Sequence, residues 1–99
     1  MTDIQSGFSS NYAQAREKFL NAAQSVGLAV DAYIHPLQGR DGETLAMDVV
    51  LDGSPDAQRL LIVSSACHGV EGYCGSGVQV HALRNSAWRA ACKAQGLAV

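Results

Sequence analysis

The sequence lacks several features that mark the simplest functional classes. It has no run of Lys and Arg, and its charges almost balance, with 7 basic and 9 acidic residues and a net charge of −2. The electrostatic footprint of a nucleic-acid-binding protein is therefore missing, and we expect no nucleic-acid partner. No apolar run approaches the roughly 20 residues that a membrane-spanning helix requires, so we expect no membrane partner.

Cysteine is scarce, and its spacing forms no recognisable framework. Cys67, Cys74 and Cys92 contain no C-x-x-C pair, and three cysteines cannot all pair within one chain. The polar segment from Met1 to Gln5 lacks the basic stretch followed by an apolar stretch that begins a secretory signal. Both features predict a reduced, cytoplasmic compartment.

Charged residues are also few. They make up 16% of the chain, whereas 47% of its residues are hydrophobic. A chain of this length forms one domain or part of one, and it buries roughly 60–65% of the surface that it exposes when unfolded. The apolar content is high for a small independent domain, which has much surface to solvate. We therefore expect residues 1–99 to form a single partial domain that further structure covers.

The first half of the chain predicts a helix and a hairpin. Apolar residues at steps of three and four predict a helix capped by Ser9 or Ser10 and ended by Gly27. Its apolar face holds Tyr12, Ala15, Phe19, Ala22 and Val26. Residues 28–35 and 45–51 alternate on either side of an Asp-Gly turn, which predicts an antiparallel hairpin with one buried face. The apolar positions are Leu28, Val30, Ala32 and Ile34, then Leu45, Met47, Val49 and Leu51.

The second half predicts part of a larger sheet. Residues 59–65, Arg-Leu-Leu-Ile-Val-Ser-Ser, have the pattern of an inner strand that is buried on both faces. A glycine-rich loop follows, then a helix from about Gly77 to Gln95 that Gly96 ends. Residues 97–99 have the pattern of the start of another buried strand. This order predicts an α/β fold, the N-terminal portion of a mixed sheet with flanking helices, incomplete relative to the full fold.

The loop after the inner strand holds the residues with the clearest chemistry. In α/β proteins this position, the carboxyl end of an inner strand, commonly holds the functional site. It contains His68-Gly69-Val70-Glu71, and its glycines let the backbone turn sharply and approach a ligand. An imidazole and a carboxylate three residues apart can bind one Zn²⁺ from the same side. Two histidines and one glutamate with an open fourth position form a recognised catalytic zinc set, so His68 and Glu71 are predicted metal ligands.

Residues 65–79, Ser-Ala-Cys-His-Gly-Val-Glu-Gly-Tyr-Cys-Gly-Ser-Gly-Val-Gln, resemble the first metal motif of the zinc carboxypeptidase superfamily. More narrowly, they resemble a bacterial branch known as a domain of unknown function, related to carboxypeptidases and to aspartoacylase and succinylglutamate desuccinylase-type deacylases. The segment Phe8-Ser9-Ser10-Asn11-Tyr12 also resembles that branch. The resemblance covers roughly residues 8–99.

The resemblance implies that His68 and Glu71 are the first two zinc ligands of a hydrolase of peptide or amide bonds. Its third ligand, its substrate-carboxylate arginine and its general-base glutamate come from later segments, and no catalytic residue is assigned within residues 1–99. The implied substrate of the full-length protein is a peptide or an acylated amino acid. Zinc is expected to bind this chain weakly or not at all, and the chain alone is predicted to be inactive. Cys67 departs from the family, which usually has a small polar residue there.

Other interpretations of these residues remain open. His68 and Glu71 could form a hydrogen-bonded loop pair without metal, and the glycines could cradle a phosphate at the helix N-terminus. His81 and His35 are better explained as surface or packing residues than as a third ligand. Cys67 beside His68 is disfavoured as a nucleophile, and Ser76 is expected to cap the second helix. Three cations of that helix, Arg84, Arg89 and Lys93, are expected on its solvated face.

The leading hypothesis is therefore the N-terminal portion of a zinc metallohydrolase of the carboxypeptidase type. The alternative belongs to another class: a non-catalytic remnant or interaction module that self-associates through an exposed sheet edge. High apolar content and an unpaired final strand favour this alternative, since free edges recruit other strands.

Overall fold

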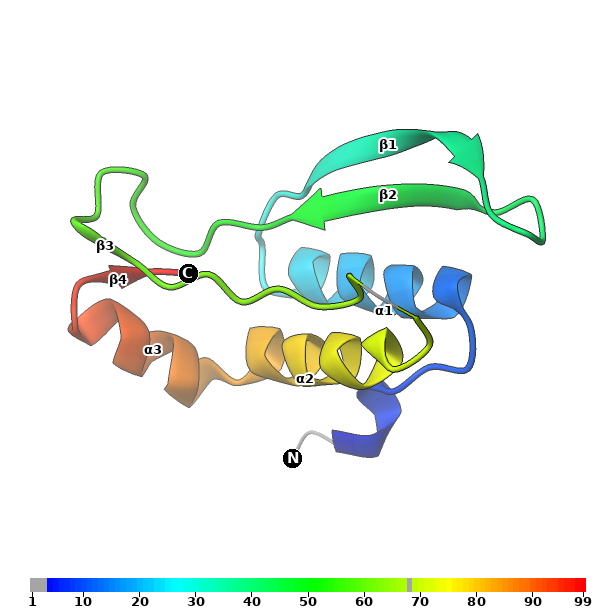
Figure 1. The fold of residues 1–99 in the computed structure, drawn as a ribbon. Helices are drawn as coiled ribbons and strands as arrows, with labels where there is room; N and C mark the ends of the chain where they lie inside the picture. The colour runs from blue at the N-terminus through cyan, green and yellow to red at the C-terminus, as the bar shows by residue number, and fades with distance from the viewer. Residues whose placement is uncertain (1–3, 68) are drawn as a thin grey trace.

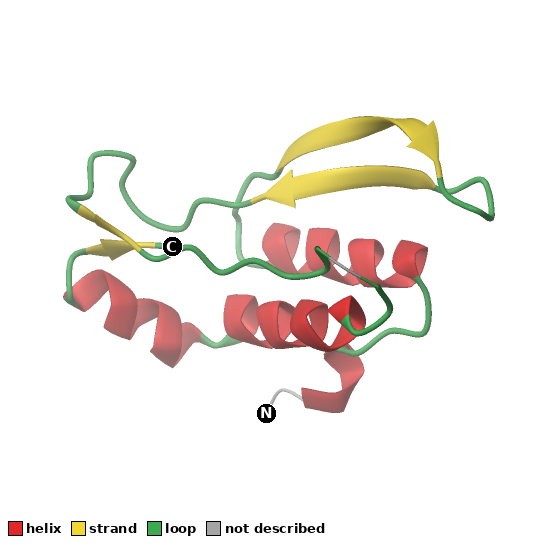
Figure 2. Cartoon of the chain, in the orientation of Figure 1, coloured by secondary structure: helices red, strands yellow, loops and turns green. Residues whose placement is uncertain are grey.

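In the computed structural model, which describes residues 4–67 and 69–99, the chain is a mixed α/β structure with helices beneath two small sheets (Figures 1 and 2). This confirms the predicted fold class. The elements are η1 (Ile4–Gly7), α1 (Tyr12–Ser25), β1 (Asp31–Gln38), β2 (Thr44–Val49), β3 (Arg59–Leu60), α2 (Gly72–Arg84), α3 (Ser86–Ala94) and β4 (Leu97–Ala98). No helix in the described part of the chain is long and apolar enough to cross a membrane.

The N-cap of helix α1 lies one residue after Ser10, the later of the two predicted caps. The side chain of Asn11 accepts a hydrogen bond from the backbone N–H of Gln14 at 2.8 Å, so Asn11 is the N-cap and the serine assignment is wrong. The predicted stop is confirmed, since Gly27 has φ +74° and Leu28 N–H bonds the carbonyl of Ala23. This geometry satisfies the last carbonyls of the helix and turns the chain toward β1.

Strands β1 and β2 form the predicted antiparallel hairpin, but the prediction of one buried face is wrong. The register pairs Tyr33 with Met47 and Ile34 with Ala46. Directly paired residues lie on the same face, so Ile34 and Met47 point to opposite faces. Met47 is 64% exposed and Ile34 59% exposed. The sequence suggested that the apolar residues of the two strands share one face. In the structure, those of β1 and those of β2 lie on opposite faces of the hairpin.

The apolar segment after β3 differs most from its prediction. Only Arg59–Leu60 pairs as a strand, in parallel with Leu97–Ala98. Its apolar side chains are not buried on both faces: Leu60, Leu61, Ile62 and Val63 are 59%, 38%, 77% and 45% exposed. A run of β-branched and aliphatic residues with this composition is typical of a covered inner strand, so the prediction of burial on both faces is wrong for this segment.

The second helix is longer than expected and divided. α2 begins at Gly72, inside the predicted loop, and ends at Arg84, whereas α3 begins at Ser86. Asn85 lies between them with ψ 93°, and its side chain accepts a hydrogen bond from Trp88 N–H at 3.0 Å. Asparagine competes for backbone groups in this way, so it ends one helix and caps the next. Ser76 lies buried within α2 and is not the predicted N-cap.

The core residues come from α1, α2, α3 and β4, and most of their side chains are small. The buried hydrophobic residues are Ala15, Ala22, Ala23, Val80, Cys92 and Ala98. Among the described residues, no large side chain is fully buried. Small buried residues, alanines on α1 and mainly glycines on α2, let the two helices pack closely side by side beneath the hairpin (Figure 1). Such side chains bury little apolar area.

Candidate functional site

The predicted metal loop connects the apolar segment after β3 to the N-terminus of α2. His68, the first predicted ligand, lies outside the described residues. Glu71, the second, directly precedes α2 with φ −61° and ψ −19°, and its side chain makes no capping hydrogen bond. The position therefore matches the expected order of strand, loop and helix, although α2 begins sooner after Glu71 than the sequence suggested.

Two residues with positive φ flank position 68. Gly69 has φ +60°, which glycine adopts without cost. Ala66 also has φ +60° and is the one described non-glycine residue with a positive φ. A left-handed conformation costs an alanine about 1–2 kcal/mol. The chain therefore stores strain at the residue two before His68, and strained backbone of this kind is concentrated at functional sites.

The other loop glycines serve packing. A Cβ on Gly72 would lie 2.5 Å from the Cα of Ala66, and one on Gly75 would lie 2.8 Å from the Cβ of Ser65. A Cβ on Gly77 would meet the ring of Phe8 at 2.3 Å. All three glycines belong to α2, so they let this helix approach the preceding segment and η1. These contacts give the three glycines a packing role, and Gly69, with its positive φ, is the turn glycine of the loop.

The Glu71 side chain folds back over the turn. A Cβ built on Gly69 would lie 2.4 Å from Oε2 and 3.1 Å from Oε1 of Glu71, so the carboxylate occupies the space that a side chain at position 69 would need. This places a carboxylate against the residue that follows His68. The donor chemistry, one imidazole and one carboxylate in a single turn, fits part of a zinc site.

The described residues do not form a complete set of metal ligands. No group of three or more His, Cys, Asp or Glu side chains comes together among these residues. His81 lies ten positions after Glu71 along α2, about 15 Å away at 1.5 Å per residue, so it cannot share a metal with Glu71. His35 is exposed on β1, where its Nδ1 accepts a hydrogen bond from Leu37 N–H at 3.0 Å.

The structure also contains an ionic cluster that the sequence did not reveal. Arg89 donates to both carboxylate oxygens of Asp52 at 2.8 and 3.2 Å, and Lys93 Nζ lies 3.1 Å from Oδ1. Asp52 is 7% exposed. Hydrogen bonds from Arg89, helped by those from Lys93, lower the pKa of Asp52 despite its burial. The expectation of a solvated face is therefore wrong for Arg89, whose side chain is 15% exposed, whereas Arg84 and Lys93 are exposed as expected.

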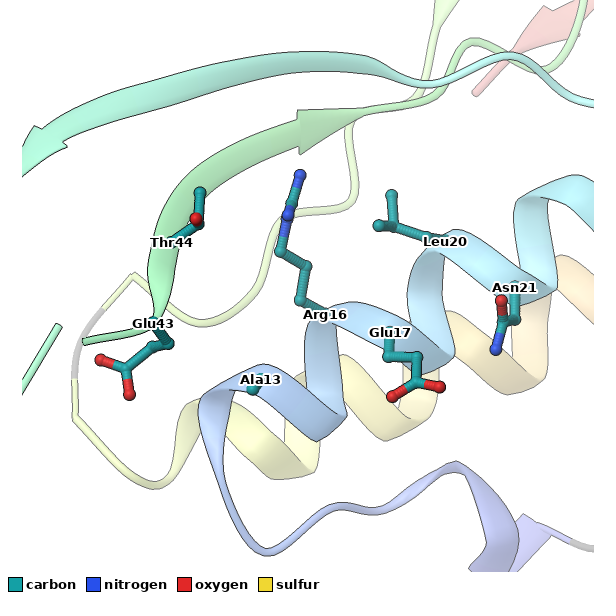
Figure 3. Close-up of a pocket in the computed structure, with 7 residues that line it drawn as sticks. All are labelled: Ala13, Arg16, Glu17, Leu20, Asn21, Glu43 and Thr44. Atoms are coloured by element: carbon teal, nitrogen blue, oxygen red, sulfur yellow. The ribbon is translucent and has the colours of Figure 1, made fainter. Parts of the chain in front are cut away.

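Two hollows of the described surface are lined by residues other than Glu71. One, of about 240 Å³, lies between α1 and the start of β2 (Figure 3) and is lined by Ala13, Arg16, Glu17, Leu20, Asn21, Glu43 and Thr44. Its cation is already used, because Arg16 Nε donates to Asp48 at 2.9 Å. The other, of about 820 Å³, is lined by Lys93 and residues of the two turns around β3 and β4. The second hollow also contains Asp56 and Arg59, and Arg59 donates to the carbonyl of Gln95.

Comparison with protein families decides the identity of the chain. A family model described as "Protein of unknown function (DUF2817)" matches residues 8–99. The chain belongs to the DUF2817 family. No curated protein and no solved structure matches it. The matched range includes both His68 and Glu71, so the candidate loop lies within the DUF2817 region.

Sequence reasoning missed Asp52 as a structural residue of this DUF2817 chain. In the sequence it stands in an Asp-Gly-Ser-Pro stretch, which is typical of a turn. Its partners are 37 and 41 residues away, and no local pattern indicates such a pairing. The available signal was the spacing of Arg89 and Lys93 by four residues, which places both on one face of a helix.

Proposed function

We propose that this DUF2817 chain is the N-terminal portion of a zinc-dependent hydrolase of peptide or amide bonds, of the carboxypeptidase or deacylase type. Glu71 carries the proposal, because its carboxylate folds over Gly69 at the junction between an apolar segment and a helix. In the sequence, Gly69 directly follows His68. The strained Ala66 at the start of the turn supports a role beyond chain connection.

His68 and Glu71 would hold the metal, and zinc bound there would polarise a substrate carbonyl and activate a water molecule. Zinc sites normally take at least three protein ligands. The residues described here supply too few, so a third ligand and a general base must come from outside this segment. The 99 residues alone are proposed to bind zinc weakly and to lack hydrolytic activity.

Calorimetric titration with zinc chloride tests this proposal. The titration uses a Cys67→Ser, Cys74→Ser background, because both thiols are exposed and could bind zinc themselves. We expect saturable heat that is lost in His68→Ala and in Glu71→Gln. The matched control is His35→Ala, which removes an exposed imidazole elsewhere and should leave the heat unchanged. Heat that persists in both ligand variants would contradict the proposal.

A second candidate function is a non-catalytic, self-associating module. The observation that favours it is the exposure of Leu60–Val63, because an uncovered apolar strand recruits another chain. Sedimentation velocity distinguishes the two candidates. A stable dimer without zinc-dependent heat supports the module, whereas a monomer that binds zinc through His68 and Glu71 supports the hydrolase portion.

A further inference from the structure

Strand β1 forms the outer edge of the hairpin, on the side of β2 that lies away from the helices (Figure 1). Every residue of β1, from Asp31 to Gln38, is exposed. Among the described residues, β1 pairs with β2 and with no other strand. Backbone groups along such an edge are available to a further strand.

The hydroxyl of Tyr12 shows which backbone groups of β1 point outward. It donates to the carbonyl of Ala46 and accepts from its N–H, at 2.9 and 2.8 Å, so the backbone of Ala46 faces away from β1. Ala46 is paired with Ile34, and the backbones of such a non-hydrogen-bonded pair face away from each other. Ile34 therefore directs its N–H and carbonyl to the outer edge. Because direction alternates along a strand, Ala32 does the same, whereas Tyr33 faces β2.

The regular part of this edge is short. The register with β2 shifts between Ile34 and Gln38, and a shift of this kind bends a strand. Pro36 lies within the irregular stretch and has no N–H to donate. Pairing with a further strand is therefore confined to residues 31–35, with Tyr33 at the centre.

This short edge is complementary to itself. When two copies run antiparallel and are centred on Tyr33, Ala32 of each copy lies opposite Ile34 of the other. Both residues direct their backbone outward, so each such pair exchanges two hydrogen bonds. A small side chain then faces a larger one on one side of the sheet, and on the other side the two Tyr33 rings meet in an aromatic cross-strand pair.

The polar residues at the ends agree with the same register, because it places Asp31 of each copy opposite His35 of the other. The His35 Nδ1 accepts a hydrogen bond from Leu37 N–H at 3.0 Å, so its Nε2 carries a proton and can donate. Directly opposed side chains have Cβ atoms about 4.5–5.5 Å apart. An imidazole donor therefore meets a carboxylate at both ends of the contact. A register shifted by two residues loses both pairs.

We propose that the β1 edge, residues 31–35, docks a second copy of this chain in antiparallel pairing about a two-fold axis at Tyr33, which joins the two hairpins into one sheet. Standard interfaces use about 20–30 residues a side. The β1 edge offers far fewer, so the dimer is a weak, reversible one. His68, Glu71 and the run Leu60–Val63 take no part, so failure of this proposal leaves both proposed functions standing.

Cysteine cross-linking in a Cys67→Ser, Cys74→Ser background tests the register. Tyr33→Cys sets each new thiol opposite its own copy, with Cα atoms about 4.5 Å apart, which a disulfide spans. The matched control is Met47→Cys, which pairs with Tyr33 on the same face and is 64% exposed against 60% for Tyr33. Its two copies would lie three strand spacings apart, about 14 Å. After mild oxidation we expect about tenfold more covalent dimer from Tyr33→Cys, because a disulfide needs Cα atoms within about 7 Å.

A charge exchange, measured by sedimentation equilibrium, tests the end pairs. His35→Asp sets two carboxylates against each other at both ends and should weaken dimerisation about tenfold, since like charges directly opposite are destabilising. Adding Asp31→His to His35→Asp restores the opposed pairs and should restore the dimer. Positions 31 and 35 lie about 13 Å apart along one strand, so this rescue cannot arise within a single chain. Circular dichroism checks that each variant is folded.

Three outcomes overturn the proposal. One is equal cross-linking of Tyr33→Cys and Met47→Cys. Another is a folded double variant that dimerises no better than His35→Asp alone. The third is a dimer that His35→Asp leaves unchanged and Ile62→Asp abolishes, because that contact lies at Leu60–Val63 and belongs to the second candidate function. A chain that stays monomeric in both assays overturns it as well.

Discussion

Replacing Asp52 by asparagine removes the charge at the centre of the ionic cluster while keeping the size of the side chain. The carboxylate accepts from two nitrogens of Arg89 and pairs with Lys93, and these bonds fasten the segment after β2 to α3. An asparagine oxygen can still accept one bond from Arg89, but its amide nitrogen faces the other donors. We therefore expect Asp52→Asn to destabilise the chain.

The magnitude follows from the exposure of each partner. The Arg89 side chain is 15% exposed, so its bonds approach the 1.5–3 kcal/mol of a hydrogen bond to a charged group, by the usual order of magnitude. The Lys93 side chain is 51% exposed, and solvent reduces its contribution to below about 1 kcal/mol. Because one bond survives, the expected loss is about 2–3 kcal/mol, which is a large share of the stability of a small domain.

Urea unfolding followed by circular dichroism measures this loss. A midpoint lower by about 1–2 M is expected, given the usual urea dependence for small proteins. Asp56→Asn is the matched control, since Asp56 is exposed and forms no ion pair among the described residues, and its midpoint should not change. An Asp52→Asn midpoint equal to that of the unchanged chain refutes the reasoning.

The pH dependence gives a second check on the same residue. Arg89 lowers the pKa of Asp52 from its ordinary value of 3.8. The stabilisation is therefore fully present above that value and is lost as pH falls through the lower pKa of the folded state. The difference in stability between the unchanged chain and Asp52→Asn should narrow below about pH 4. A constant difference down to pH 2 contradicts the assigned pairing.

Three further substitutions test the local structure by urea unfolding. Ala66→Gly should stabilise by about 0.5–1 kcal/mol, because it relieves the positive φ; an unchanged or lower midpoint would show that no strain is stored. Gly72→Ala should destabilise the chain, because the added Cβ would lie too close to Ala66. Alanine is intrinsically better than glycine in a helix by about 1 kcal/mol. A gain in stability would therefore disprove the packing role of Gly72. Asn85→Ala should cost about 1 kcal/mol by removing the cap on Trp88 N–H, and a neutral result would show that the break between α2 and α3 is set by packing.

Local chemistry explains the elements that the sequence predicted well. Gly27 and Gly96 adopt positive φ as expected of glycines that end helices. The Asp41-Gly42 turn joins two alternating segments into an antiparallel hairpin. Helix α1 buries Ala15 and Ala22 at the predicted spacing. Each of these outcomes depends on residues within a few positions of one another, so the pattern alone suffices.

Tertiary structure decided the rest, because the deciding contacts join distant segments. The hairpin register places Met47 and Ile34 on opposite faces, which alternation within each strand cannot reveal. The start of α2 at Gly72 depends on how closely the helix approaches Ala66, and a glycine-rich stretch alone predicts a loop instead. The pairing of Asp52 with Arg89 likewise requires the fold to bring them together.

For the candidate site, the sequence determined the residue types and their order, and the structure determined what surrounds them. The motif named His68 and Glu71 from strand, loop and glycine signals. The structure added the strain at Ala66, the carboxylate lying over Gly69 and the packing contacts of three glycines in α2. Side-chain direction within a turn depends on backbone angles and close contacts, which a linear pattern does not contain.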